Sequence, residues 1–290
     1  MRAGEYLAAW ALAEQEMAER DPAKRDDPTL PYHLRWVWDG REYRGKHCLV
    51  RCYHGLGDTI QFARFLPLLR SRVASLTVEV QGRLLPLLQR SATKAGKTSI
   101  RFLPFDEARP LPPSECDMEI TELGFALKAA PEDVPFPYLT ACKGVLPRGT
   151  MGLCYGAGDW DPSRSIPPAL LAPLCEEARC LSLMPEPTTL PVINRAGCPF
   201  DMDATAALVA ATDLVITVDT MIAHLAGAMG KPVWLLLNAN PDWRWPTEGI
   251  RTPWYPSMRI YAQLKTGGWE PVVQQVRRDL AARHGGSIRD

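Results

Sequence analysis

The chain has 290 residues, with 33 Lys or Arg balanced by 33 Asp or Glu, so its formal charge is zero. Such a balance excludes a strong field of one sign, and we predict no nucleic-acid partner and at most a peripheral membrane contact. The length suggests one large or two ordinary domains. No apolar run reaches the roughly 18 residues of a transmembrane helix. Eight scattered cysteines without a C-x-x-C pair indicate free thiols in a reducing, cytoplasmic compartment.

The first 35 residues read as a helical extension. Residues 5–20 carry a short apolar stripe interrupted by Glu14 and Glu16, which is typical of an amphipathic helix and not of a signal peptide. A charged, Pro-containing loop follows at 21–31. Residues 33–45, rich in Trp and Arg, read as a surface segment that leads into the first domain.

An alternation of strands and helices begins at residue 47. In the first half the pattern predicts strands at 47–52, 76–80, 99–103 and 116–120, and helices at 59–72, 83–89 and 123–128. Four prolines between 131 and 147 then exclude a helix or a central strand and predict a linker. The second half predicts strands at 151–155, 180–183, 214–218 and 233–237, and helices at 168–178, 203–211, 221–229 and 269–284.

This alternation on both sides of a linker predicts an α/β fold with two Rossmann-like, doubly wound domains that face a central cleft. We place the extension at 1–35, the first domain at 36–145 and the second at 146–290. One arrangement open to the last helix is to pack back on the first domain. In doubly wound sheets, ligands bind at the carboxyl ends of the strands.

The stretch 213–237 is the most informative unit of the chain. A β-branched strand run is followed by Asp219 and Thr220, which supply an N-cap for the next helix. A helix that starts at the end of a parallel strand offers free N–H groups and a positive dipole end to an anion. His224, about one turn into the helix, is placed to reach the same anion. The alternative is an ordinary capped helix in which His224 is a surface or core residue.

The glycine-containing loop 54–58 ends the first strand. Gly55 and Gly57 let a backbone approach a ligand closely, but the loop is not a G-x-G-x-x-G fingerprint, so a dinucleotide site is poorly supported. Asp58 has two competing roles. It can cap the following helix, or it can face the cleft and take a proton from an acceptor hydroxyl.

A second loop, 156–165, ends the first strand of the second half. Arg164 with Ser165, just before a helix, can bind phosphate, and the alternative is a solvated loop arginine. Asp159-Trp160-Asp161 resembles the D-x-D motif that holds a divalent metal in one class of sugar transferases. Two exposed loop aspartates are the preferred reading here, so no metal site is predicted.

Aromatic residues concentrate in the Pro-rich segment 240–256, as Asn-Pro-Asp-Trp-Arg-Trp and then Pro-Trp-Tyr-Pro. Such residues can stack on a base or a sugar, and they can equally pin a loop to the surface. Their density favours a binding loop.

Together these stretches resemble a known family. HGLGDTIQFARFLPLL (54–69), RSIP (164–167), DLVITVDTMIAHLAGAMGKPVW (213–234), PDWRW (241–245) and PWYPSMR (253–259) look like the heptosyltransferase-like glycosyltransferases. More closely, they resemble the bacterial subgroup in which this domain follows tetratricopeptide repeats, and residues 4–17 look like a remnant of a last repeat helix. The resemblance covers nearly all of the chain from about residue 36 onward.

The resemblance implies a GT-B fold and a metal-independent glycosyltransferase that needs no cofactor. It moves a sugar from a nucleotide-sugar donor, held by the C-terminal domain, to a hydroxyl of a glycan, lipid-linked glycan or protein held by the N-terminal domain. Asp58 is then the general base, and Arg164 acts near the leaving group. We assign the remaining positions to the donor side (Asp219, Thr220, Met221, His224, Ser165 and Gly156) and to the acceptor side (His54, Gly55, Gly57, Gln61, Trp243 and Arg244).

Three stretches depart from the family pattern. Met221-Ile222 stand where relatives carry small residues, and Met184-Pro185-Glu186 stand where relatives often carry Gln-Lys-Gly. The loop 156–164, which leads to Arg164, is shorter and more acidic than the family pattern. These changes keep open the alternative of a catalytically degenerate GT-B binding or scaffold module. A sugar-nucleotide epimerase on the same plan ranks last, because no residues select it.

Overall fold

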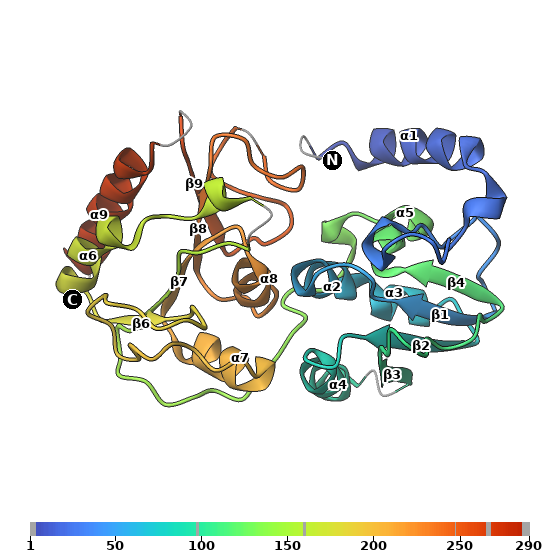
Figure 1. The fold of residues 1–290 in the computed structure, drawn as a ribbon, viewed down its shortest axis with the longest axis horizontal. Coiled ribbons are helices and arrows are strands. Elements are labelled where there is room, and N and C mark those ends of the chain that lie inside the picture. Colours follow the sequence, from blue (N-terminus) through green and yellow to red (C-terminus); the bar gives the residue numbers. More distant parts are fainter. Residues whose placement is uncertain (1–3, 97–98, 159–160, 247, 265–267, 286–290) are drawn as a thin grey trace. The chain divides into compact units, whose positions relative to one another are not determined.

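The computed structural model describes residues 4–96, 99–158, 161–246, 248–264 and 268–285. The chain divides into two compact units, 1–141 and 142–290 (Figure 1). The division falls in the Pro-rich segment where the sequence predicts a linker. The N-terminal extension packs as part of the first unit and not as a separate body.

Within the described residues, the N-terminal unit has a four-stranded parallel sheet in the order β3-β2-β1-β4. Its strands are β1 (His47–Arg51), β2 (Ser75–Val80), β3 (Ile100–Pro104) and β4 (Cys116–Glu119). Its helices are α1 (Tyr6–Glu19), α2 (Leu56–Phe62), α3 (Leu66–Arg70), α4 (Leu85–Lys94) and α5 (Leu123–Leu127). Short 3₁₀ turns lie at Pro22–Lys24, Tyr32–Leu34, Ala63–Phe65, Ile120–Glu122 and Pro131–Asp133.

The single helix expected at 59–72 differs from the structure in two ways. It starts three residues earlier, at Leu56, and it is divided into α2 and α3 by a 3₁₀ turn. Pro67 explains the division, because a proline inside a continuous helix would remove a backbone hydrogen bond and clash with the preceding turn. Here Pro67 stands in the first turn of α3, where its missing N–H costs nothing.

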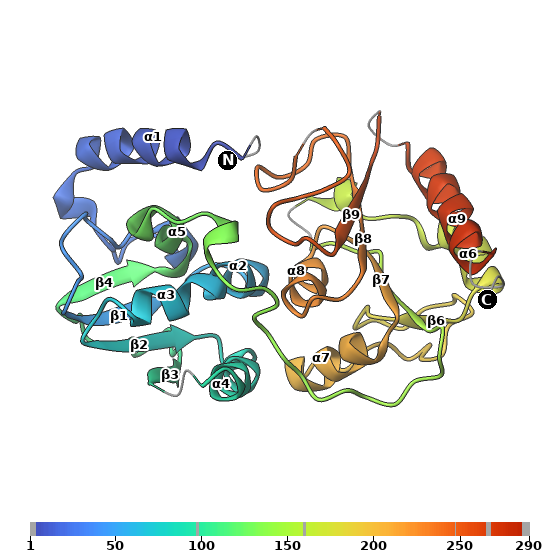
Figure 2. The same cartoon turned by 180° about the vertical axis from the view of Figure 1, so that it is seen from behind.

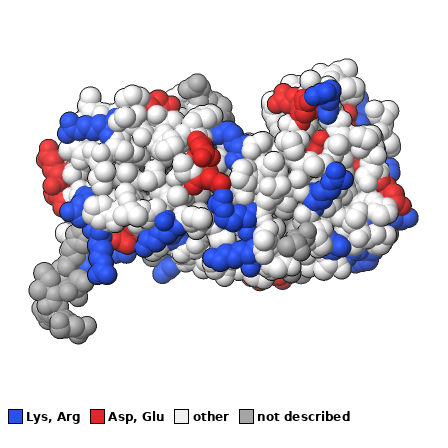
Figure 3. Space-filling model, turned by 90° about the horizontal axis from the view of Figure 1, so that it is seen from below, with Lys and Arg blue, Asp and Glu red and all other residues white. Residues whose placement is uncertain are grey.

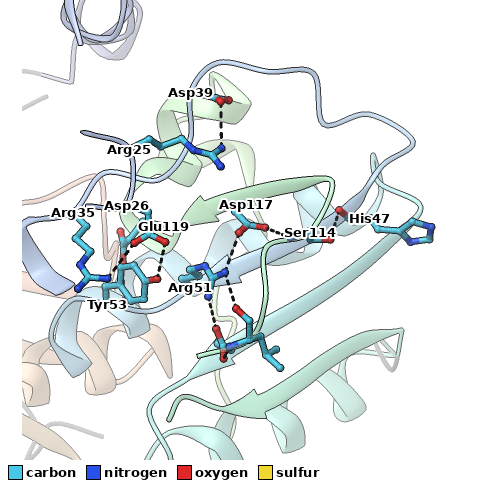
Figure 4. Close-up of polar contacts among 12 residues, drawn as sticks. Arg25, Asp26, Arg35, Asp39, His47, Arg51, Tyr53, Ser114, Asp117 and Glu119 are labelled. Atoms are coloured by element: carbon cyan, nitrogen blue, oxygen red, sulfur yellow. Dashed lines mark hydrogen bonds and ion pairs between the residues drawn. The ribbon is translucent and has the colours of Figure 1, made fainter. Parts of the chain in front are cut away.

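The two faces of the N-terminal sheet differ in polarity. Alternate strand residues such as Cys48 and Val50 form an apolar face. On the opposite face, the buried Arg51 bonds Glu79 at 2.8 Å and Asp117 at 3.0 Å (Figure 4). The three charges come from β2, β1 and β4, so this ion triad joins three adjacent strands side chain to side chain.

Helix α1 is anchored to the first unit by an aromatic contact. Trp10 packs on Phe125 of α5 with the ring centroids 6.1 Å apart. Gly124 allows this approach, because a Cβ at that position would lie 3.2 Å from the Trp10 ring. The expected helix extends from Tyr6 to Glu19, and it buries Tyr6 and Trp10 but leaves Leu7 and Leu12 exposed.

Within the described residues, the C-terminal unit has five parallel strands in the order β6-β5-β7-β8-β9. The strands are β5 (Met151–Cys154), β6 (Cys180–Ser182), β7 (Leu214–Val218), β8 (Val233–Leu237) and β9 (Met258–Ala262). The helices are α6 (Pro168–Glu177), α7 (Met202–Ala211), α8 (Met221–Ala228) and α9 (Trp269–Gly285), with a 3₁₀ turn at Pro162–Arg164. The central strands are buried along their whole length, as expected of a parallel sheet covered on both faces.

Two features of this unit differ from the expectation. The sequence pattern gave no sign of β9, because its five residues follow a Pro- and Trp-rich loop and alternate weakly. Helix α9 belongs to the C-terminal unit. Its apolar residues Trp269, Val273 and Val276 join the core of the C-terminal unit, and the helix lies beside α6 in both views (Figures 1 and 2).

The surface agrees with the balanced composition. Basic and acidic side chains both occur among uncharged residues on the face drawn in Figure 3. None of the helices in the described ranges is long and apolar enough to cross a bilayer. All eight cysteines are free thiols, and seven of them are buried. The structure thus confirms an α/β fold of two Rossmann-like units.

Candidate functional site

Strand order reverses once in each sheet, and those points lie next to the predicted site residues. The reversal falls between β1 and β4 in the first unit and between β5 and β7 in the second. Ligands of doubly wound sheets bind outside the carboxyl ends of the strands at such points. The loop at 54–58 follows β1, and the helix start at 219–221 follows β7.

Helix α8 begins at Met221 and is capped by Thr220 alone. The Thr220 backbone is extended, and its hydroxyl accepts a hydrogen bond from the Ile222 N–H at 3.3 Å. Cys154, the last residue of β5, lies 3.5 Å from the same hydroxyl. The helix start therefore sits directly beside the end of the neighbouring strand, at the switch point of the sheet.

Arg164 extends from its 3₁₀ turn to this junction. One terminal guanidinium nitrogen donates to the backbone carbonyl of Asp219 at 2.9 Å, and only 11% of the side chain is exposed. The alternative of a solvated loop arginine is therefore wrong. A guanidinium beside a helix N-terminus places two positive groups close together, an arrangement that can bind an anion.

Asp219 does not cap the helix, as the sequence had suggested for the pair Asp219-Thr220. Its buried carboxylate lies 3.7 Å from the Arg164 guanidinium. Burial raises the pKa of Asp219 above its ordinary value, and the Trp245 N–H and the charges of Arg244 and Arg164 offset part of that rise. Asp219 thus joins Arg164 to the segment that follows β8.

His224 is buried among aromatic residues. Its Nδ1 lies 2.9 Å from the Tyr255 hydroxyl. Its ring stacks on Trp245 with centroids 5.4 Å apart and an interplanar angle of 25°. Side chains of a helix lean toward its N-terminus, so His224 leans toward the α8 start.

The glycine loop after β5 is filled by a neighbouring side chain. The Gly156 N–H donates to the Met184 sulfur at 3.3 Å, and a Cβ at Gly156 would lie 2.5 Å from the Met184 methyl group. Ser165 accepts a hydrogen bond from the Ala157 N–H at 3.0 Å, which closes the loop on itself. Ser165 therefore has a structural partner at this position.

Three of the four aromatic side chains in the segment 240–256 are buried. Trp245, Trp254 and Tyr255 are at most 2% exposed, so the expectation that this segment presents its rings to a ligand is wrong for these three. Trp243 is 39% exposed, and the Arg244 guanidinium lies 5.0 Å from its ring centroid. The rings are buried because they pack around α8, as the contacts of His224 show.

In the first unit, Asp58 lies in the first turn of α2. The helix begins at Leu56 after an N-cap at Gly55 that makes no side-chain hydrogen bond. Asp58 is therefore not the N-cap, and its half-buried carboxylate complements the helix dipole from inside the turn. A Cβ at Gly55 would lie 3.3 Å from an Asp58 carboxylate oxygen, so this glycine leaves room for the carboxylate. Gly57 lies in the same turn.

His54 faces the buried Glu119 at the switch point of the first sheet. The distance from Nδ1 to the carboxylate is 3.0 Å, and 30% of the His54 side chain is exposed. Burial lowers the pKa of His54, but the hydrogen bond and the charge of Glu119 and the charge of Asp58 outweigh it and raise the pKa. Gln61, assigned to the acceptor side, is fully buried in α2.

Several residues that shape these loops were missed by the sequence reasoning. Gln81, just after β2, donates to the carbonyls of Cys52 and His54 and accepts from Thr59, so it holds the glycine loop in place. Glu119 at the end of β4 was also missed, and Tyr255 was expected only as a ring that could stack on a base or a sugar. Only the position of Glu119 at a strand end could have signalled it.

The expectation of no metal site rested on the aspartates at 159–161. Asp159 and Trp160 lie outside the described residues. Asp161 caps the 3₁₀ turn by accepting from the Ser163 N–H. Among the described residues, no cluster of three or more His, Cys, Asp or Glu side chains could hold a metal ion.

Three comparisons relate this geometry to known proteins. Residues 192–267 match the model of glycosyltransferase family 9 (heptosyltransferase). Protein FlbA of Caulobacter vibrioides is 28% identical over 327 residues, a match that covers 96% of this chain and 53% of that protein. The chain thus spans about half the length of this curated relative.

Two solved structures share the fold. The iron-containing dodecameric glycosyltransferase TibC of enterotoxigenic E. coli H10407 has a TM-score of 0.57 at 12% identity, over 80% of this chain and 66% of that one. A family 9 glycosyltransferase of Veillonella parvula has a TM-score of 0.55 at 12% identity, over 82% and 97%. The chain therefore has the GT-B fold of solved glycosyltransferases, and residues 192–267 carry the sequence pattern of glycosyltransferase family 9.

Proposed function

We propose that this chain is a metal-independent glycosyltransferase that moves a sugar from a nucleotide-sugar donor to a hydroxyl acceptor. The observation that carries the proposal is the contact between the Arg164 guanidinium and the Asp219 carbonyl at the start of α8. It assembles a cationic side chain and a helix N-terminus at the switch point, where a diphosphate would bind. The match of residues 192–267 to glycosyltransferase family 9 supports the same activity.

The chemistry follows from the charges that develop in the reaction. The acceptor oxygen attacks the anomeric carbon of the sugar, the bond from that carbon to the phosphate oxygen breaks, and the nucleoside diphosphate leaves with the electron pair. Arg164 and the α8 N-terminus stabilise the charge of the departing diphosphate, which a metal ion would otherwise do. Asp58 takes the proton of the acceptor hydroxyl.

The donor site is tested by calorimetry with nucleoside diphosphates and nucleotide sugars, ADP-heptose among them. We expect binding to the wild type, and a loss of about 10-fold or more in affinity for Arg164→Gln, because a charge-assisted hydrogen bond is removed. Arg179→Gln, at an exposed arginine of the same unit, is the control and should bind normally. No binding of any nucleotide to the wild type would refute the proposal.

The role of Asp58 gives a separate prediction. Asp58→Asn should abolish sugar transfer and leave donor affinity nearly unchanged, because the base acts on the acceptor alone. Transfer kinetics and calorimetry on the same preparation measure both quantities. Asp106→Asn, at an exposed loop aspartate of the same unit, should keep its activity. Full turnover in Asp58→Asn would remove Asp58 from the mechanism.

One observation favours the alternative of a non-catalytic binding or scaffold module. The Met184 side chain occupies the space over Gly156 at the end of β5 and takes up its N–H. A donor that approaches this strand end has to displace it. If nucleotide sugars bind but are neither hydrolysed nor transferred to any acceptor, this alternative replaces the first. The acceptor, the cytoplasmic location and the tetratricopeptide association remain predictions from the sequence.

A further inference from the structure

The aromatic segment after β8 makes a polar contact with α8 at His224. The Tyr255 hydroxyl lies 2.9 Å from Nδ1 of His224, and both residues are buried. A neutral imidazole carries one proton, and the hydrogen bond at one ring nitrogen decides which nitrogen carries it. Tyr255 thus stands where it can set the state of the histidine that leans toward the start of α8.

Two further contacts fix the geometry of this pair. A Cβ at Gly227 would lie 2.6 Å from two atoms of the Tyr255 ring, so that ring rests directly on the backbone of α8. His224 and Gly227 are three residues apart and share one face of the helix. Trp245 stacks on the imidazole, and its ring centroid lies 6.4 Å from that of Tyr255. The histidine ring is thus held within one cluster of three rings.

The same aromatic segment reaches the anion site. The indole N–H of Trp245 offsets part of the rise in the pKa of the buried Asp219, and the Arg164 guanidinium lies 3.7 Å from that carboxylate. Trp245 and Tyr255 therefore both contact His224, and Trp245 also acts on Asp219. This arrangement explains why Trp245 and Tyr255 are buried, which a role in stacking on a ligand at the surface does not explain.

We propose that Tyr255 is a positioning residue for His224, whose hydroxyl donates to Nδ1 and keeps the ring proton on Nε2. In that tautomer Nε2 is a hydrogen-bond donor, as an oxyanion at the start of α8 requires. The proposal rests on the proposed function for its ligand, a diphosphate. It concerns the orientation and tautomer of the ring, and Tyr255 does not touch the substrate.

Nitrogen NMR of the histidine rings tests the tautomer directly. The chain has five histidines, and His224→Gln identifies the signal of His224 by its loss. We expect the wild type to show the Nε2-protonated tautomer at neutral pH, and Tyr255→Phe to shift toward a mixture. Tyr255→Phe keeps the ring that packs on Gly227, and an unchanged near-ultraviolet circular dichroism spectrum verifies the fold.

Calorimetry with inorganic pyrophosphate, a probe independent of base and sugar, measures the consequence. We expect Tyr255→Phe to weaken pyrophosphate binding about 5- to 10-fold. Tyr261→Phe is the matched control, because Tyr261 is another buried tyrosine of this unit whose hydroxyl bonds Asp279 at 2.9 Å. It should change neither the His224 signal nor the affinity.

Three results would overturn the proposal. They are an Nδ1-protonated ring in the wild type, a Tyr255→Phe spectrum identical to that of the wild type, and an unchanged pyrophosphate affinity in this variant. If the wild type binds neither pyrophosphate nor any nucleotide, the proposed function fails, and the NMR measurement by itself still decides whether Tyr255 sets the tautomer.

Discussion

At the scale of single residues, the residues predicted for the site fall into two groups: some lie together at one strand end, and others make structural contacts instead. Arg164 and Thr220 lie at one strand end, as a shared anion site requires. Ser165 and Gly156 have structural partners instead. Residue type and spacing could mark Arg164 and His224 as candidates, but their contacts with Asp219 and Tyr255 join residues 55 and 31 positions apart, which no local pattern predicts.

His54 leads to a prediction about pH. Its pKa is raised in the folded chain, so the protonated form contributes stability fully below the unfolded value of about 6.5, and that contribution is lost as the pH rises through the folded value. The difference in unfolding free energy between wild type and His54→Gln should therefore be larger at acidic than at alkaline pH. Urea titrations at about pH 5.5 and 9 measure it.

The exposed His33 supplies the control, because His33→Gln removes a histidine without a buried carboxylate partner. If His54→Gln and His33→Gln change stability equally at both pH values, the pairing of His54 with Glu119 has no energetic role.

At the scale of elements, long periodic segments could be predicted and interrupted ones could not. The strand at 233–237 and the strand at 214–218 have the predicted bounds, because buried parallel strands read as continuous apolar runs. The helix at 59–72 was wrong at its start and its middle, where Gly55 caps the chain without a side-chain signal and Pro67 divides it. The sequence did not predict β9, because this strand is recognised by its pairing with β8 and not by its own residue pattern.

The cap of α8 carries an element-scale prediction. Thr220→Ala should lower the free energy of unfolding by about 1 kcal/mol, within a range of about 0.5–2, because the Ile222 N–H loses its side-chain acceptor. Thr220→Ser keeps the hydroxyl and should stay close to the wild type. Denaturant titration of the three proteins measures their free energies of unfolding. Equal losses of stability in both variants would mean that the cap hydrogen bond contributes nothing.

At the scale of the whole molecule, two Rossmann-like units could be predicted from the alternation of strands and helices on both sides of a Pro-rich segment. The unit to which each flanking helix belongs could not be predicted. Helix α1 belongs to the first unit through Trp10, and α9 belongs to the second through Trp269. An amphipathic helix shows which of its faces is buried, but its sequence does not show which surface covers that face.

The ion triad of the N-terminal sheet leads to a prediction about the independence of the two units. Arg51→Met should lower the stability of the N-terminal unit by about 3–5 kcal/mol, because Glu79 and Asp117 remain buried without their partner. Nucleotide affinity in the absence of denaturant should stay unchanged, since the donor residues lie in the other unit. Arg101→Met, at an exposed position of the same sheet, is the control.

Denaturant titration and calorimetry on the same preparations separate the two effects. A loss of affinity in Arg51→Met that matches its loss of stability would show that the units are energetically coupled.

The close contact between Gly227 and Tyr255 has a consequence for the history of this sequence. A side chain at 227 and an aromatic ring at 255 cannot occupy the same space. In descendants of a common ancestor, a larger residue at 227 should therefore appear only together with a smaller one at 255. The two positions should evolve as a pair although they are 28 residues apart along the chain. A sequence that breaks this pairing would have to shape the start of α8 in another way.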